Sequence, residues 1–398
     1  MSDGVAALPL AGIRVVEFVH MVMGPTCGLV LADLGADVIK VEPAPRGDNT
    51  RRLVGSGAGF FAAFNRNKRS LALDLRADAG REIARRLIAT ADVVAENFRP
   101  GAMAELGLDY AALKEAHPRL VYCSLKGFLP GPYEHRTALD EVVQMMGGLA
   151  YMTGPPGRPL RAGSSVNDIM GGMFGAIGIL AALRRRDATG SGGEVAASLF
   201  ENNVFLMAQH MAQYAVTGKP AAPMPERLSV WAVYDVFDTK DGDQVFVGVV
   251  TDTQWRRFCE SFGLADYAAD PALATNPQRV AARERIMPRL RELFGGYAKA
   301  ELMAKLEAVN LPFAPIARPE ELFDDPQLAE PGGLVETVLP DGRETRLPAL
   351  PLALDGRRFG RRRGLPRVGE HARELMRELG YDAAEIDRLI AARVVAED

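Results

Sequence analysis

The sequence has few of the residues that bind metals or form disulfide frameworks. Its 398 residues include 3 cysteines and 5 histidines, with neither a CxxC pair nor a helically spaced histidine pair. We therefore expect no disulfide and no metal site. The 47 basic and 51 acidic side chains leave a net charge of -4, which gives no global reason to bind nucleic acid or a membrane. The N-terminal segment lacks the basic and apolar regions of a secretory signal, so a cytoplasmic location is expected.

Several familiar motifs are also missing. The loop after the first expected strand, residues 19–25, contains no GxGxxG, so the glycines that let a dinucleotide pyrophosphate approach the backbone are absent. No GxSxG, HExxH, Walker A or EF-hand motif occurs. The most apolar stretch, residues 169–183, is shorter than a usual membrane span and rich in glycine. We interpret it as a helix that is buried on nearly every face.

The N-terminal half alternates between strand and helix patterns. Apolar, β-branched runs predict strands at residues 13–18, 37–41, 93–97 and 120–125, and helical patterns occupy residues 24–35, 78–90 and 110–116. This alternation predicts an α/β fold with a parallel sheet covered on both faces. Ligands of such sheets usually bind at the loops that follow the strands.

A Pro- and Gly-rich segment at residues 217–226 resembles a linker to a second, smaller domain. Beyond it, two strand patterns flank Asp241-Gly242 as in a hairpin, and helices are expected at residues 252–262, 279–294 and 299–309. We therefore divide the chain into a large domain that begins with residues 1–215, a small α+β domain at 225–328, and a closing segment at 329–398.

Asp168 stands out among the carboxylates because it directly precedes the apolar stretch. One interpretation is a helix N-cap, since aspartate is a preferred capping residue and most capping aspartates are only structural. The other is a functional carboxylate in poorly hydrated surroundings, where unpaired helix amides could stabilise a negative charge nearby. The local sequence favours the cap and leaves the functional interpretation open.

Six motifs, taken in order, resemble family III CoA-transferases, the CaiB/BaiF group that includes formyl-CoA transferase. They are LADLGADVIKVEP at 31–43 with RGD at 46–48, FNRNKRSLALDL at 64–75, ADVVAENFRPGAM at 91–103, LVYCSLKGF at 120–128, NDIMGGMFGAIGILAAL at 167–183 and GEHARELMRELGY at 369–381. The resemblance implies a Rossmann-like large domain built from the N-terminal part and the returning C-terminus. It also implies a smaller α+β domain between them and an interlocked homodimer.

The resemblance makes Asp168 the catalytic nucleophile, which reverses the preference for a cap. Its carboxylate would attack an acyl-CoA thioester and pass through an aspartyl anhydride to an aspartyl-CoA thioester, with a carboxylic acid as acceptor. Coenzyme A thioesters are then substrates, and no metal or tightly bound cofactor is needed. Backbone amides near Gly147 and Gly148, or near Gly171 and Gly172, are candidate oxyanion donors, and close helix packing is the alternative role of these glycines.

The matching motifs also imply a CoA-binding surface. Its candidate residues are His20, Leu73, Asp74, Leu75, Arg76, Asn97, Phe98 and Arg99. Arginine suits both the phosphates and the adenine base of CoA, and Arg69 is expected to bind with Arg76 and Arg99. The alternative for each of the three arginines is a solvated surface position.

The residues expected around the acyl group depart from formyl-CoA transferase. Leu139-Asp140 stands where that enzyme has Tyr-Glu and where the related α-methylacyl-CoA racemases have His-Asp. Oxalate and formate are therefore not expected as substrates. Racemisation remains an alternative, although this chain lacks the histidine that serves as one of the two bases in the racemases. An inactive CoA-binding subunit is a further alternative.

Cations close to the site favour dicarboxylic acyl groups such as mesaconyl, itaconyl, succinyl or citramalyl, with transfer between two molecules or within one. Arg136, with His135 and next to Thr137, is predicted to bind the second carboxylate. The alternatives are that Arg136 binds a CoA phosphate or faces solvent.

Overall fold

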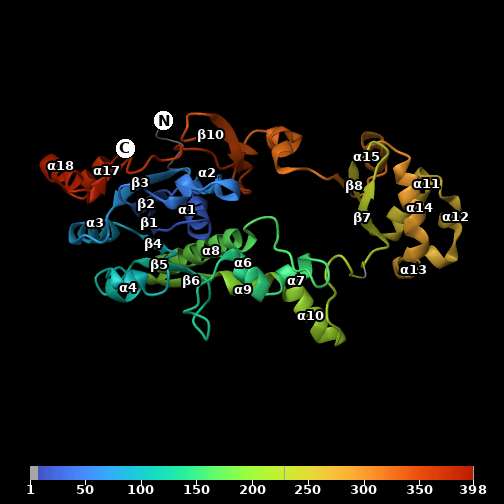
Figure 1. Cartoon of the computed structure of the whole chain (residues 1–398), viewed down its shortest axis with the longest axis horizontal. Coiled ribbons are helices and arrows are strands. Elements are labelled where there is room, and N and C mark those ends of the chain that lie inside the picture. Colours follow the sequence, from blue (N-terminus) through green and yellow to red (C-terminus); the bar gives the residue numbers. More distant parts are fainter. Residues whose placement is uncertain (1–7, 228, 398) are drawn as a thin grey trace. The chain divides into compact units, whose positions relative to one another are not determined.

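The computed structural model describes residues 8–227 and 229–397 and contains two compact units. Unit 1 runs up to Pro225 and resumes at Pro326, and unit 2 comprises Glu226–Asp325. The C-terminal segment, coloured orange to red in Figure 1, therefore belongs to the same unit as the N-terminal strands. Each unit has its own hydrophobic core, and we describe the two separately.

Unit 1 is built on a seven-stranded sheet in the order β14-β3-β2-β1-β4-β5-β6. The first six strands in sequence run parallel, and β14 pairs antiparallel with β3. The strand order reverses between β1 and β4, as in doubly wound folds, so the predicted α/β class is confirmed. The strands are β1 (Arg14–Phe18), β2 (Asp37–Pro43), β3 (Lys68–Leu73), β4 (Val93–Glu96), β5 (Val121–Lys126), β6 (Gly193–Ser198) and β14 (Val395–Ala396).

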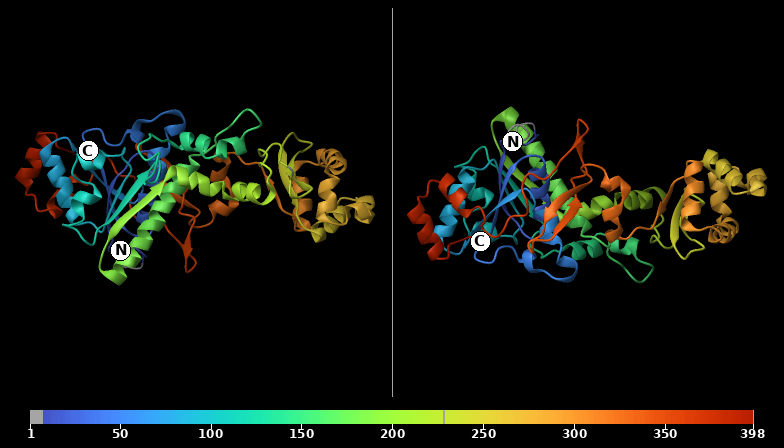
Figure 2. Two further views of the ribbon diagram at one scale, coloured as in Figure 1. Left: turned by 90° about the horizontal axis from the view of Figure 1, so that it is seen from below. Right: turned by 90° about the horizontal axis from the view of Figure 1, so that it is seen from above.

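Helices cover both faces of this sheet. On one face, α1 (Met23–Asp33) and α8 (Val166–Thr189) pack on Cys123 and Leu125 of β5. On the other, α3 (Asp78–Ala89), α17 (Ala372–Glu378) and α18 (Ala383–Ala391) form a second core with Val94 and Tyr122. Figure 2 shows the two red C-terminal helices beside α3 in both views. The alternating sides of β5 thus belong to different cores, as a strand of period two requires.

The remaining elements of unit 1 are short. Its other helices are α2 (Phe60–Phe64), α4 (Ala102–Glu105), α5 (Tyr110–Leu113), α6 (Asp140–Met146), α7 (Leu149–Thr153), α9 (Leu199–Leu206), α10 (Ala208–Thr217) and α16 (Pro326–Ala329), with 3-10 turns at Asn49–Arg52 and Gly55–Gly57. Two hairpins, β10 (Leu334–Val338) with β11 (Glu344–Pro348) and β12 (Ala353–Leu354) with β13 (Arg357–Arg358), lie in the returning segment.

Strand β3 is a central element of the sheet that the sequence patterns did not reveal. Its residues KRSLAL begin with two cations, yet every one of them is buried. Lys68 pairs with Glu17 at 2.8 Å, and Arg69 pairs with Asp37 at 2.6 Å. A buried charge is tolerated when it has a partner, and those partners come from other strands, which a local pattern does not show.

Helix α8 corrects one expectation, because it is not buried on every face. One side packs on α1 and the sheet, whereas Met173, Phe174 and Ile177 on the other side are exposed. Phe174 continues this apolar side to Phe205 of α9, with ring centroids 5.7 Å apart. Within the described residues, α8 alone has the length and hydropathy that could span a membrane, but its packing is that of a partly buried core helix.

Unit 2 contains a three-stranded antiparallel sheet in the order β7-β8-β9 with helices packed on it. The predicted hairpin is β7 (Val233–Asp238) and β8 (Gln244–Val249), joined by a turn with Gly242 at a φ of 79°. The other elements are β9 (Phe313–Pro315), α11 (Asp252–Ser261), α12 (Ala265–Ala269), α13 (Asn276–Ala281), α14 (Arg283–Gly295) and α15 (Lys299–Ala308), with 3-10 turns at Pro271–Leu273 and Pro319–Asp324.

Candidate functional site

Asp168 occupies the third position of α8 and does not cap that helix. The N-cap is Ser165, whose side chain makes no capping hydrogen bond. Instead, one carboxylate oxygen of Asp140, at the start of α6, accepts the backbone N–H groups of Asn167 at 2.8 Å and Asp168 at 3.1 Å. The capping interpretation of Asp168 is therefore wrong. Asp140 satisfies those amides and leaves the Asp168 carboxylate free for another role.

The surroundings of Asp168 disfavour its charged form. Burial, followed by the nearby negative charge of Asp140, raises the pKa of Asp168 to about 7, and the positive charge of Arg161 acts in the opposite direction. Among the described residues, no hydrogen bond or ion pair reaches its carboxylate oxygens. A poorly solvated carboxylate that loses its proton near neutral pH is suited to nucleophilic attack.

Buried amide side chains lie behind the first turn of α8. Asn167 donates to the side-chain oxygen of Asn203 at 3.1 Å, and Asn202 donates to the carbonyl of Asn167 at 2.9 Å. Each of these three asparagines keeps one buried amide atom without a partner among the described residues: Asn167 Oδ1, Asn202 Oδ1 and Asn203 Nδ2. These residues were not singled out from the sequence, because asparagines on separate segments carry no local signal. Their unused capacity marks a polar region behind the turn that carries Asp168.

The candidate oxyanion glycines play different parts. A side chain at Gly172 would lie 2.5 Å from the carbonyl of Met23, so this glycine lets α8 approach α1, and Gly171 likewise faces Met23. Gly147 donates its N–H to Val143 at 2.8 Å. Gly148 has a φ of 88°, and within the described residues its N–H has no backbone partner. Of the four glycines, Gly148 therefore has the amide best able to receive an oxyanion.

Three of the expected CoA residues meet at the point where the strand order reverses. His20 follows β1, and its backbone N–H and carbonyl bond the side chain of Asn97, which follows β4, at 2.9 and 2.8 Å. The rings of His20 and Phe98 stack with centroids 6.0 Å apart. Burial of the imidazole lowers the pKa of His20 against the opposing negative charge of Asp48. Doubly wound sheets usually hold ligands at this point of the sheet edge.

The other expected CoA residues lie on neighbouring loops of the same edge. Leu73 ends β3 and is buried, and Asp74 and Leu75 follow it with partial exposure. Arg76 is 88% exposed and pairs with Asp74 at 2.9 Å. Arg99 pairs with Glu105 at 2.7 Å. The structure does not bring Arg76 and Arg99 into contact with each other.

Arg69 corrects the expectation that it binds CoA with those two arginines. Its side chain is 4% exposed and pairs with Asp37, Glu374 and Glu378 at 2.6–2.9 Å. These carboxylates hold the pKa of Arg69 above its usual value despite burial. Arg69 lies near the start of β3, whereas the expected CoA loops follow the ends of the strands. Its role is therefore to join the sheet to α17.

The residues expected at the acyl end are mostly exposed. His135 lies 3.9 Å from Glu134, and the Arg136 guanidinium lies 5.0 Å from the centre of the Tyr133 ring. Thr137 is exposed, as is Leu139, and Leu139 directly precedes α6. Of this segment, the structure connects only Asp140 to Asp168.

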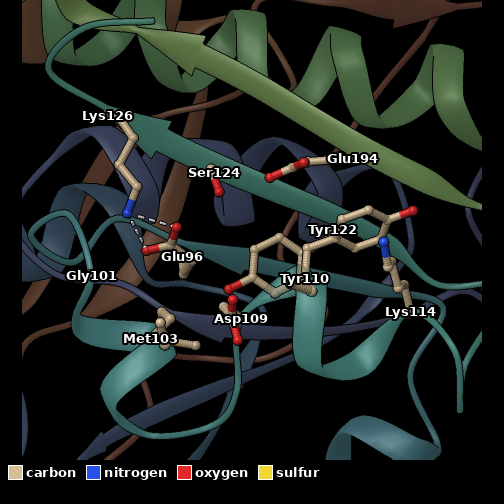
Figure 3. A pocket seen from close by; sticks show the side chains of 12 residues that line it. Glu96, Gly101, Met103, Asp109, Tyr110, Lys114, Tyr122, Ser124, Lys126 and Glu194 are labelled. Atoms are coloured by element: carbon tan, nitrogen blue, oxygen red, sulfur yellow. Dashed lines mark hydrogen bonds and ion pairs between the residues drawn. The ribbon is translucent and has the colours of Figure 1, made fainter. Parts of the chain in front are cut away.

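A pocket of about 420 Å³ lies on the sheet face opposite α8 (Figure 3). Lys126 crosses it to Glu96 at 2.7 Å and also bonds the carbonyl of Phe98 at 2.8 Å, which anchors the loop that holds Asn97. Asp168 is not among the lining residues, which are Glu96, Gly101, Met103, Ala104, Asp109, Tyr110, Ala111, Lys114, Tyr122, Ser124, Lys126 and Glu194. The pocket therefore adjoins the expected CoA loop and does not include Asp168.

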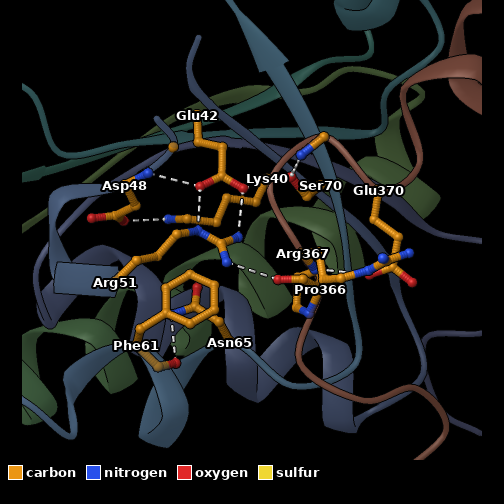
Figure 4. Close-up of polar contacts among 12 residues, drawn as sticks. Lys40, Glu42, Asp48, Arg51, Phe61, Asn65, Ser70, Pro366, Arg367 and Glu370 are labelled. Atoms are coloured by element: carbon orange, nitrogen blue, oxygen red, sulfur yellow. Dashed lines mark hydrogen bonds and ion pairs between the residues drawn. The ribbon is translucent and has the colours of Figure 1, made fainter. Parts of the chain in front are cut away.

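A second buried polar cluster follows β2 (Figure 4). Lys40 pairs with Asp48 at 2.8 Å and bonds the carbonyl of Val19, next to His20. Glu42 pairs with Arg51 at 2.7 Å and accepts the backbone N–H of Asp48 at 2.8 Å. Each carboxylate in this cluster thus has a cation. The cluster holds the loops around the strand ends and contains no free nucleophile.

No group of three His, Cys, Asp or Glu side chains suited to a metal ion occurs among residues 8–227 and 229–397. The candidate site therefore consists of Asp168, the amides around it and the loops at the strand ends.

Comparison with known proteins gives this arrangement a chemical context. Residues 10–372 match the model of CoA-transferase family III. The succinate–glutarate CoA-transferase of Agrobacterium fabrum is 36% identical over 385 residues, which cover 93% of this chain and 96% of that protein. The succinyl-CoA:glutarate CoA-transferase of Mus musculus is 30% identical over 403 residues, covering 100% of this chain and 92% of the mouse protein.

The fold agrees with that match. The crystal structure of a CaiB/BaiF family protein from Brucella suis superposes with a TM-score of 0.82 at 34% identity, covering 94% of this chain and 99% of that one. The family match, the shared fold and the unpaired carboxylate on α8 support one conclusion. This chain is an enzyme of CoA-transferase family III, which uses CoA thioesters as substrates.

Proposed function

We propose that the protein transfers CoA from a dicarboxylyl-CoA to a free dicarboxylic acid, with Asp168 as the covalent nucleophile. The observation that carries the proposal is the Asp168 carboxylate, which lies on the first turn of α8 without a cationic partner and with a pKa of about 7. Both relatives above have succinate or its CoA ester and glutarate in their names, which supports dicarboxylic substrates.

In the first half of the reaction, an Asp168 oxygen attacks the thioester carbonyl and the C–S bond breaks. The CoA thiolate leaves, and a mixed anhydride remains. The thiolate then attacks the Asp168 carbonyl of that anhydride, which releases the first acid and forms an aspartyl-CoA thioester. The acceptor carboxylate repeats the two steps in reverse and regenerates Asp168. The Gly148 amide is our candidate donor to the oxyanions, and one such donor contributes about 3–4 kcal/mol.

The CoA moiety is proposed to lie along the strand-end loops. His20, Asn97 and Phe98 would contact it at the point where the strand order reverses, and Leu73, Asp74, Leu75, Arg76 and Arg99 would contribute from neighbouring loops. The pairs Arg76–Asp74 and Arg99–Glu105 are exposed. Such pairs are weak, so a phosphate can replace the carboxylate partner.

The direct test incubates the purified protein with succinyl-CoA and glutarate and measures glutaryl-CoA by mass spectrometry. With succinyl-CoA alone, the peptide that contains Asp168 should gain the mass of CoA less water. The Asp168→Asn variant should form neither product nor adduct. Wild-type turnover without any adduct at Asp168 would argue against covalent transfer through this residue.

A homodimer is part of the proposal. The apolar side of α8 to α10 supports it, with Ile177 56%, Phe205 65% and Met211 58% exposed, since patches of this kind mark interfaces. Wild-type protein should sediment as a dimer at every dilution at which it stays folded. Ile177→Glu should weaken or prevent assembly, and Val338→Glu, on a different exposed element, should not. A compact, active wild-type monomer would contradict the dimer.

A further inference from the structure

The loop between α7 and α8 carries an arginine that the sequence motifs did not single out. Arg161 lies four residues before Ser165, the N-cap of α8. Its neighbour Ala162 donates its N–H to the side-chain oxygen of Gln144 at 2.8 Å. Gln144 is fully buried on α6, so this end of the loop is anchored on the helix that also carries Asp140.

Hydrogen bonds connect the anchor of Arg161 to the nucleophile. The Gln144 amide donates to one oxygen of Asp140, and the other oxygen of Asp140 accepts the backbone N–H groups of Asn167 and Asp168. The position of the Arg161 backbone is therefore fixed relative to the first turn of α8. Because every link in this chain of contacts is buried or partly buried, the spacing does not depend on exposed side chains.

Arg161 is connected to the hydrogen-bonded network of Asp168 through its neighbour Ala162. Arg161 makes no ion pair with Asp168, yet its charge lowers the pKa of that carboxyl against the larger effects of burial and Asp140. The Arg161 guanidinium pairs with the side chain of Glu141 and donates a hydrogen bond to the carbonyl of Ala162. The side chains of Arg161 and Glu141 are 39% and 48% exposed, and such a pair stabilises a protein by about 0–1 kcal/mol. A substrate carboxylate can therefore replace Glu141.

Arg136 lacks these features. Its guanidinium rests over the Tyr133 ring in an exposed loop, and no hydrogen bond links its side chain to the polar contacts around Asp168. A residue that reads the far end of an acyl group must stand at a fixed distance from the reacting carbonyl. Of the two arginines, Arg161 meets that requirement.

We propose that Arg161 binds the distal carboxylate of the acyl group, with Glu141 as the partner that the substrate displaces, and so makes the enzyme selective for dicarboxylyl-CoA esters. The inference rests on the proposed CoA transfer at Asp168 and adds the residue that sets substrate class. A guanidinium grips a carboxylate through two parallel hydrogen bonds, which fixes direction as well as affinity. A monocarboxylic acyl group leaves Arg161 paired with Glu141.

The test compares succinyl-CoA with butyryl-CoA, which has the same number of acyl carbons but no distal carboxylate. Arg161→Gln should lower kcat/KM for succinyl-CoA by about 10- to 100-fold, mostly through KM, because a charged hydrogen bond is lost. The value for butyryl-CoA should stay within about twofold of wild type. Arg158→Gln, a matched loss of charge in the same loop, should alter neither, and Arg161→Lys should recover part of the succinyl-CoA activity.

The Glu141→Gln variant should change KM for succinyl-CoA in the opposite direction. Without the competing carboxylate, KM for succinyl-CoA should fall a few-fold, and KM for butyryl-CoA should not change. Equal losses for both esters in Arg161→Gln, or a selective loss in Arg136→Gln alone, would overturn the assignment of Arg161. Formation of the aspartyl-CoA adduct from butyryl-CoA in Arg161→Gln separates this failure from a failure of the proposed function, in which wild-type protein forms no adduct from either ester.

Discussion

Two regions of unit 1 bury carboxylates close to the strand ends, and they differ in what accompanies the charge. After β2, Asp48 pairs with Lys40 and Glu42 pairs with Arg51 (Figure 4). At the start of α8, Asp168 has no cation in contact, and its nearest acidic neighbour, Asp140, disfavours its charge. The first arrangement satisfies its buried charges, whereas the second leaves a carboxylate that is poorly solvated and suited to the attack proposed above. The difference teaches that a cationic partner stabilises a buried carboxylate as an anion, whereas a buried carboxylate without one has a raised pKa.

The largest expected effect comes from removing the unpaired carboxylate. Asp168→Asn should reduce CoA exchange by about 10⁴-fold or more, because the amide cannot form the anhydride. The folded pKa of about 7 lies above the unfolded value, so ionisation of Asp168 opposes folding at higher pH. The variant should therefore melt at a higher temperature than wild type at pH 8, and this difference should shrink as pH falls from 7 toward 4. If the variant melted at a lower temperature than wild type at pH 8, the structure would not disfavour the charged form of Asp168.

In the cluster of paired charges after β2, removal of one partner should lower the stability of the fold. Lys40→Met removes the cation of Asp48 and leaves a buried charge alone, which typically costs about 3–5 kcal/mol. Denaturant unfolding should show that loss, and the double variant Lys40→Met with Asp48→Leu should recover most of it. The exposed pair offers a control, since Arg76→Gln should leave the unfolding midpoint unchanged. If Lys40→Met and Arg76→Gln lowered the free energy of unfolding by similar amounts, the distinction between buried and exposed ion pairs would be wrong.

The charges around Asp168 should move the pH profile of exchange in opposite directions. Wild-type rate should rise with pH through about 7, as Asp168 loses its proton. Asp140→Asn removes the neighbouring negative charge while keeping an acceptor oxygen, so the midpoint should fall. Arg161→Gln removes a positive charge, so the midpoint should rise, each by about half a pH unit or more. The initial rate of adduct formation against pH measures both, and shifts of the same sign would contradict the geometry.

The smallest effects are expected on the CoA loops. Arg76→Gln and Arg99→Gln should raise KM for acyl-CoA only a few-fold, because each arginine is exposed and already shares its charge with a neighbouring carboxylate. The increase should diminish at high ionic strength, where exposed charges are screened. Desulfo- or dephospho-CoA analogues identify which part of CoA is involved. No change at low salt would place both arginines outside the CoA surface.

The local patterns anticipated much of the framework. The strands around residues 13–18, 37–41, 93–97 and 120–125 and the hairpin of unit 2 could be predicted because apolar periodicity and turn residues are local signals. Strand β3 could not, since Lys68 and Arg69 are buried only by virtue of partners on other strands.

The candidate site also combines features that the sequence predicts with features that only the tertiary structure determines. Motif order pointed to Asp168, and a helix at that position follows from the apolar stretch after it. The tertiary structure decided that Asp140 caps α8 in its place, that Gly171 and Gly172 serve helix packing, and that the loop of Arg161 is anchored to the helix that carries Asp140. A sequence determines periodicity, turns and the chemistry of each side chain. Which distant charges meet, and whether each finds a partner, depends on contacts between segments that are far apart along the chain.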